Sequence, residues 1–224
     1  LSTEPDAAGI RRIDLAVAEE CLQKPALRYD RGDHRYDMMS ALIKSIRGSD
    51  SQAALYWLAC MLEGGEDPKV IARRLLVHAS EDIGLANPQA LLQAAAAWTA
   101  VQAVGMPEAR ISLAQCVIYL AESPKSNSVI KAIDAAIADV RNRPTGAVPK
   151  HLRDSHYPGA KKLGHGKGYL YPHDFPGHWV EQQYLPDELV GVRYYEPTRQ
   201  GQEATIWKNH QERLRRKAPE EGKN

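Results

Sequence analysis

Residues 51–63 have the sequence SQAALYWLACMLE, which is apolar on nearly every side when it is wound as a helix. A helix without a polar face lies in the middle of a bundle or in a subunit interface. Ser49 or Asp50 is placed to cap its start, and two glycines follow its end. The segment therefore predicts a helical protein, and we expect Tyr56, Trp57 and Met61 to lie in the core or between subunits.

The sequence around this segment carries the same kind of punctuation. Asp67-Pro68 and Asn87-Pro88 each supply a capping side chain and a proline for the first helical turn, and Pro107 opens a further helix. Apolar spacing predicts helices over residues 36–47, 68–79, 89–104, 107–120 and 128–141. Short connections between such helices indicate neighbours packed in pairs, so we predict an all-α helical bundle. The alanine run 94–97 and Trp98 are expected in its core or in a subunit interface.

The composition changes after Pro144. Residues 144–197 are rich in Gly, Pro, His and Tyr and show no helical period. Their aromatic content argues against disorder, so we expect an ordered, extended and mostly irregular arm that packs on the bundle. A final helix is predicted over residues 201–217. Near the N-terminus, residues 10–23 predict a lone short helix, which we expect to end a domain that lies upstream.

The overall composition is that of an ordinary globular protein. The net charge is +1, so any nucleic-acid surface must be local, and 43% of the residues are hydrophobic. The three cysteines form no CxxC pair and fit a reducing, cytoplasmic compartment. The longest apolar run, residues 90–104, is too short to span a bilayer, and the N-terminus lacks the pattern of a signal peptide.

The sequence offers no complete active site. Residues 164–169, GHGKGY, lack the spacing and the hydroxyl residue of a phosphate-binding loop. Cys116 lies in an apolar run, and no GxSxG elbow occurs. Five histidines of the arm lack metal-ligand spacing and are interpreted as loop residues: His151, His156, His165, His173 and His178. We therefore predict no catalytic, cofactor-binding or metal-binding residues.

Two basic clusters are candidates for contact with DNA phosphates, although isolated basic helix ends usually serve as dipole partners and solvating groups. The first lies in the arm, where an aromatic and basic stretch runs from Lys161 to Trp179, and the second lies in the last predicted helix. The candidate residues are Lys161, Lys162, Lys167, Arg213, Arg215 and Arg216. This pattern keeps open an alternative function, a DNA- or partner-binding module.

Several blocks of sequence resemble the RarA/MgsA family of replication-associated AAA+ ATPases, which includes the Werner-helicase-interacting ATPase. In the helical part these blocks are KSIRGSD (44–50), AALYWLA (53–59), MLEGGEDP (61–68), ASEDIGLA (79–86) and PKSNS (124–128). In the arm they are VPKHLR (148–153), YPHD (171–174), QYLP (183–186) and YYEPT (194–198). The resemblance extends from about Ile10 to Gly201.

The resemblance implies a division of the chain and a role. Residues 1–28 would end the AAA+ lid, 29–143 would form a clamp-loader-like oligomerisation collar, and 144–224 would form the arm and terminal helix. It implies a homo-oligomer, a tetramer, within a DNA-dependent ATPase that acts in replication-fork maintenance, recombination and repair. ATP and magnesium would bind the motor domain, which this chain does not match. Further implied partners are DNA and single-strand-binding protein, in the bacterial cytoplasm at the nucleoid.

Overall fold

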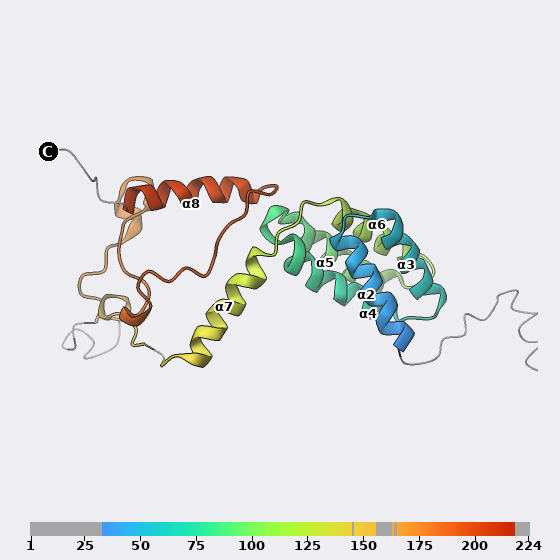
Figure 1. Ribbon diagram of the computed structural model, residues 1–224, viewed down its shortest axis with the longest axis horizontal. Helices are drawn as coiled ribbons and strands as arrows, with labels where there is room; N and C mark the ends of the chain where they lie inside the picture. The colour runs from blue at the N-terminus through green and yellow to red at the C-terminus, as the bar shows by residue number, and fades with distance from the viewer. Residues whose placement is uncertain (1–32, 145, 156–162, 164, 218–224) are drawn as a thin grey trace, which may run out of the picture. The chain divides into compact units, whose positions relative to one another are not determined.

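The computed structural model describes residues 33–144, 146–155, 163 and 165–217 (Figure 1). All regular elements in these residues are helical, and the predicted all-α class is confirmed. Contacts divide the chain into two compact units. Within the described residues, unit 1 contains residues 33–78 and 92–122, and unit 2 contains residues 79–91 and those from 123 onward. Each unit is described by itself.

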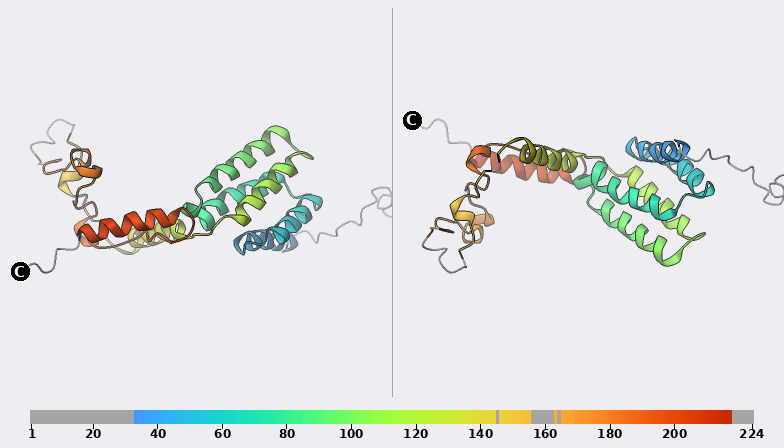
Figure 2. Two further views of the ribbon diagram at one scale, coloured as in Figure 1. Left: turned by 90° about the horizontal axis from the view of Figure 1, so that it is seen from above. Right: turned by 90° about the horizontal axis from the view of Figure 1, so that it is seen from below.

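Unit 1 is a bundle of helices with short connections. It contains α2 (Asp33–Arg47), α3 (Ser51–Glu63), α4 (Pro68–His78), most of α5 (Gln89–Val104) and α6 (Ala109–Glu122). Figure 2 shows α5 and α6 as consecutive helices that run in opposite directions. Helix α3 packs most extensively against α2 and α6. Its buried residues Ala54, Leu58 and Met61 follow the helical spacing and form one stripe.

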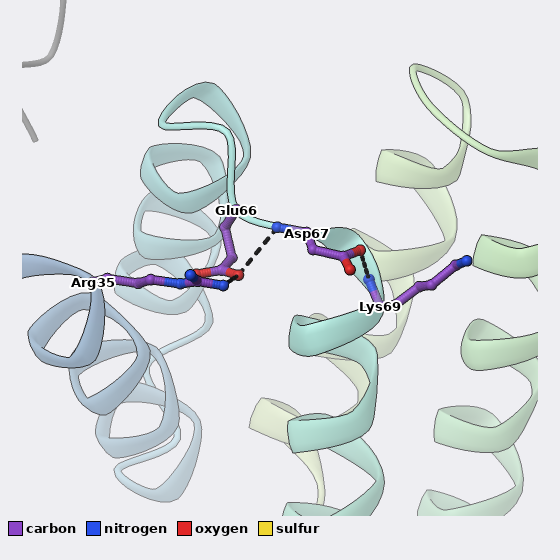
Figure 3. Close-up of polar contacts among 4 residues, drawn as sticks. All are labelled: Arg35, Glu66, Asp67 and Lys69. Carbon is purple, nitrogen blue, oxygen red and sulfur yellow. Dashed lines mark hydrogen bonds and ion pairs between the residues drawn. The ribbon is translucent and has the colours of Figure 1, made fainter. Parts of the chain in front are cut away.

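The helix starts of unit 1 follow the capping chemistry of the sequence. The Asp50 carboxylate accepts a hydrogen bond of 2.8 Å from the Ala53 amide at the start of α3. Asp67 accepts one of 2.8 Å from the Lys69 amide at the start of α4 (Figure 3). Both bonds satisfy amides that have no partner within their own helix. Because these bonds are local, the sequence predicts the first residues of α3 and α4 correctly.

A salt bridge ties the first turn of α2 to the α3–α4 connection. The Arg35 guanidinium donates to both carboxylate oxygens of Glu66, as Figure 3 shows. Glu66 Oε1 also accepts a hydrogen bond of 3.0 Å from the Asp67 amide. The Arg35 side chain is 54% exposed, so this bridge fixes the geometry of the connection and adds little to the free energy of unfolding.

Unit 2 is built around two longer helices and an irregular arm. A turn of π-helix (Ala79–Ile83) and a 3-10 turn (Gly84–Ala86) precede α7 (Ser128–Asn142), and α8 (Glu203–Lys217) ends the described chain. In the described residues between α7 and α8, the regular elements are short 3-10 turns at Lys150–Leu152, Pro172–Asp174, Pro176–His178 and Asp187–Leu189. The prediction of an extended, mostly irregular arm followed by a helix is confirmed.

Three helix starts differ from those predicted. Helix α2 begins at Asp33, three residues before the predicted start. The sequence did not predict these residues as helical because the first turn is polar and carries no apolar signal. Helix α6 begins two residues later than predicted, since residues 106–108 form a turn. Helix α8 begins at Glu203 because Gly201 has a φ of +50°, which is incompatible with a right-handed helix. The helix predicted at residues 10–23 lies outside the described residues.

None of the described helices combines the length and the apolar character needed to span a lipid bilayer.

Candidate functional site

The start of α8 is held by a buried carboxylate. Glu203 is fully buried and accepts hydrogen bonds from the hydroxyls of Ser128, Thr198 and Tyr195. Ser128 lies at the start of α7, whereas Tyr195 and Thr198 lie among the last residues before α8. Glu203 therefore links the start of α8 to the residues just before it and, across 75 positions of sequence, to the start of α7.

Hydrogen bonding decides the charge state of Glu203. Burial alone would raise the pKa of its carboxyl group, but hydrogen bonds from Ser126, Ser128, Thr198 and Tyr195 favour the ionised form and lower the pKa overall. Burial and the bond to Glu203 raise the pKa of the Tyr195 phenol, which stays protonated as a donor. The cluster is therefore a carboxylate surrounded by neutral hydroxyl donors.

Backbone contacts fix the same junction. The Gln202 amide donates to the Ala86 carbonyl at 2.8 Å, and the Ser126 amide donates to the Asp82 carbonyl at 2.8 Å. At the other end of the connection, the Tyr194 hydroxyl donates to Asp139 of α7 at 2.9 Å. The last part of the arm and the start of α8 thus have fixed positions within unit 2.

A cavity of about 590 Å³ lies between the second half of the arm and the second half of α8. Its volume is within the range of about 300–1,000 Å³ that is typical of small-ligand sites. The arm contributes aromatic, polar and aliphatic side chains, and α8 contributes one face. The main lining residues are Trp179, Tyr184, Val192, Arg193, His210 and Arg213.

Internal hydrogen bonds hold the arm wall of this cavity in shape. The Gln182 amide group donates to the Leu170 carbonyl at 2.7 Å and to the Tyr184 hydroxyl at 2.8 Å. Gln183 donates to the Leu185 carbonyl at 2.9 Å and to Asp187 at 2.6 Å. The Tyr184 ring is held by its hydroxyl group while 52% of the residue remains exposed. The wall therefore presents an aromatic ring in a preformed position.

The cavity also contains two guanidinium groups, those of Arg193 and Arg213, that take part in no ion pair among the described residues. Among the described residues, the side chains of Arg193, His210 and Arg213 form no ion pair or hydrogen bond. Arg199 differs, because its guanidinium stacks over the Trp207 ring at 4.2 Å. Glu181 also lines the cavity and has an interaction of its own. The unengaged charges of the cavity are therefore positive.

A second cavity, of about 340 Å³, runs along α7. Leu85, Val129, Ile133 and Tyr195 are among its lining residues, and none of the lining side chains is charged. Such a surface lacks the groups that bind a nucleotide or a metal ion.

Comparisons with known proteins agree with this architecture. The family described as MgsA AAA+ ATPase C terminal matches residues 48–214, and the AAA C-terminal domain family matches residues 1–47. The first match includes residues of both units and the whole cavity lining. The chain belongs to the MgsA C-terminal family.

Three curated proteins illustrate what this chain is similar to. The replication-associated recombination protein A of Bacillus subtilis is 55% identical over 90% of this chain and 48% of its own length. Its namesake in Escherichia coli is 43% identical over 91% of this chain and 46% of its own length. The ATPase WRNIP1 of Dictyostelium discoideum is 42% identical over 78% of this chain and 20% of its own length. The chain spans about half the length of the bacterial relatives.

Of the predicted DNA contacts that the structure describes, Arg213 alone lines the cavity. Arg215 is exposed on the same helix but is not part of the lining, and Arg216 lies in the last turn of α8. Lys167 is exposed in the turn at residues 165–168. Lys161 and Lys162 lie outside the described residues. Arg213 and Trp179 therefore line the same cavity, although the sequence suggested their two regions as separate sites.

The predicted core or interface residues of unit 1 divide into two kinds. Met61 is 1% exposed and belongs to the core, whereas Tyr56 is 62% exposed. Trp57 is half-buried, and its ring meets that of Tyr56 edge-on with centroids 5.2 Å apart. Trp98 is half-buried on α5. Helix α3 therefore has a core face and an aromatic face that the core does not use.

Other candidates for chemistry have structural surroundings. Burial raises the pKa of the Cys116 thiol to about 12, so it remains a neutral thiol in the core of unit 1. The rings of His173 and His178 are tilted by 52° with centroids 4.9 Å apart, and among the described residues no acidic or cysteine ligand completes a metal site with them.

Sequence reasoning missed most of the cavity lining. Tyr184, Arg193 and His210 were not candidates. A local signal existed on α8, where His210, Arg213 and Leu214 have the i, i+3, i+4 spacing of one helical face. The arm gives no such signal, because irregular backbone has no period that assigns side chains to a face.

Proposed function

We propose that this chain is the self-assembling C-terminal part of an AAA+ ATPase that acts in replication-associated recombination. Membership of the MgsA C-terminal family and the names of the bacterial relatives support the recombination role. The apolar surface of unit 1 supports self-assembly and is the observation that carries the proposal.

Unit 1 leaves many large apolar side chains exposed for so small a bundle. They occur on all five of its helices: Tyr36, Tyr56, Val77, Leu92, Val104, Ile111 and Ile118. Ile111 and Ile118 are 62% and 41% exposed and lie seven residues apart, on one face of α6. Exposed apolar surface marks protein interaction sites when it is contiguous and exceeds a few hundred Å², and we propose that this face of α6 belongs to such a site.

A second copy of the chain is the occupant that fits this surface. Unit 1 exposes these aliphatic and aromatic side chains beside charged ones, and exposed apolar groups of this kind are enriched in interfaces between permanently associated copies. The neighbouring Gln115 and Arg110 on α6 provide a polar margin, as expected around an apolar contact. We therefore assign the homo-oligomer contact to unit 1.

The remaining parts of the proposal follow from the family. We propose that residues 1–28 end an AAA+ lid, that 29–143 form the collar and that 144–224 form the arm. ATP and magnesium would bind a motor domain outside these 224 residues, so the chain itself would not hydrolyse ATP. A tetramer, association with single-strand-binding protein and a place at the bacterial nucleoid belong to the same proposal.

Charge substitution on α6 tests the assembly. We expect the double variant Ile111→Glu/Ile118→Glu to reduce the molar mass, measured by light scattering after gel filtration, to that of the 24.9 kDa monomer. Two like charges buried at a symmetric contact disfavour association by several kcal/mol, which is about a thousandfold or more in Kd.

The matched control is Ile111→Val/Ile118→Val, which keeps the face apolar and should keep the mass of the assembly. Circular dichroism should show the same helix content for both variants, because the two side chains are exposed. An unchanged assembly in the glutamate variant would remove α6 from the contact.

A further inference from the structure

We propose that the cavity between the arm and α8 binds single-stranded nucleic acid, with a base stacked on Tyr184 or Trp179 and phosphates on Arg193 and Arg213. These four residues will be called the cavity set. The inference is independent of self-assembly, because all of the cavity lining belongs to unit 2 and the proposed oligomer contact belongs to unit 1.

The charges of the cavity select an anionic ligand. Arg193 and Arg213 are exposed, line the same cavity and form no ion pair among the described residues. Guanidinium groups bind phosphate oxygens through parallel hydrogen bonds, and both donors here are available. His210 of α8 also lines the cavity and is half-buried.

The aromatic groups select a ligand with flat apolar faces. The Gln182 amide fixes Tyr184 at its hydroxyl group while more than half of the residue remains exposed. A ring held in this way loses little conformational entropy when a base stacks on it. Cationic groups beside aromatic platforms are the combination by which proteins hold unpaired bases and their backbone.

The size of the cavity favours single strands over duplex. A volume of about 590 Å³ accommodates an unstacked nucleotide but not a double helix, whose bases are already stacked and offer no free faces. An acidic peptide would also meet the two arginines. A peptide gains less from the two aromatic rings than stacked bases do, so we favour nucleic acid.

Fluorescence anisotropy with the 224-residue chain and a labelled oligothymidylate of about 16 nucleotides tests the proposal. We expect Arg213→Ala and Arg193→Ala each to weaken binding and to lower the slope of log K against log salt by about 0.7, the value for one phosphate contact on a single strand. Arg215→Ala is the matched control, because Arg215 is exposed on the same helix but outside the cavity lining. Its effect should be less than about twofold.

Tyrosine variants separate stacking from charge. Tyr184→Ala should weaken binding about fivefold or more without changing the salt slope, since one stacked base is lost but no phosphate contact. Tyr184→Phe keeps the ring and should bind within about twofold of the unsubstituted chain, although it loses the hydrogen bond from Gln182.

Oligouridylate, a duplex of equal length and an acidic peptide complete the test. Binding of either single strand and weaker binding of the duplex support the proposal. Absence of single-strand binding at low salt, equal losses in Arg213→Ala and Arg215→Ala, or preferential binding of the peptide would overturn it. Light scattering on the same samples should give an unchanged mass, which distinguishes loss of the site from loss of assembly.

Discussion

At the scale of single residues, Glu203 is the buried hydrogen-bond acceptor that links the start of α8 to the start of α7 in unit 2. Its ionised carboxylate is stabilised by hydroxyl donors, and its pKa lies below the ordinary value of 4.5. A group with a lowered folded pKa contributes stability above its unfolded pKa, and this contribution is lost as the pH falls through the folded value. We therefore expect unit 2 to lose stability below a pH of about 4.5.

The variant Glu203→Gln tests this interpretation. At pH 7 it should lower the free energy of unfolding by about 1–3 kcal/mol, because buried donors lose a charged acceptor. The difference from the unsubstituted chain should shrink as the pH falls below 4.5. Urea unfolding followed by circular dichroism across this range measures it. Glu212→Gln, an exposed position on the same helix, should change stability by less than about 0.5 kcal/mol. A loss in Glu203→Gln that does not vary with pH would contradict the role of the charge.

At the scale of secondary-structure elements, the sequence predicts helices well and their long-range partners poorly. The ends of α3 and α5 follow from Asp50, Asn87 and the glycines that end both helices, since capping bonds are local. The Ser128–Glu203 bond joins residues 75 positions apart, and no periodic pattern encodes it. The cavity was not predicted for the same reason: its lining comes from two segments, the arm and α8, that are separated in the sequence.

The entry into α8 allows a prediction at this scale. A Cβ atom on Gly201, which has a φ of +50°, would lie 2.2 Å from the Ala86 carbonyl oxygen and 2.6 Å from Pro124 Cγ. Gly201→Ala should therefore destabilise unit 2 by at least about 3 kcal/mol. Gly191→Ala is the control: its φ is +88° but the space around it is open, so only backbone strain of about 1–2 kcal/mol applies. Equal urea midpoints for the two variants would show that α8 does not approach the Ala86 turn as described.

At the scale of the whole molecule, we propose different tasks for the two units. Unit 1 has an apolar surface suited to another copy of itself, and unit 2 has a cationic and aromatic cavity suited to unpaired nucleic acid. An assembled protein would therefore contain several such cavities. Binding of one strand to more than one of them would raise the overall affinity above that of a single cavity. Both tasks fit an AAA+ protein of replication-associated recombination, and neither needs a catalytic centre in this chain.

Sedimentation equilibrium of the unsubstituted chain over a wide concentration range tests the central claim, self-assembly, most directly. The account predicts a molar mass that is an integral multiple of 24.9 kDa and that falls toward the monomer only at high dilution. A mass of 24.9 kDa at every concentration would contradict it.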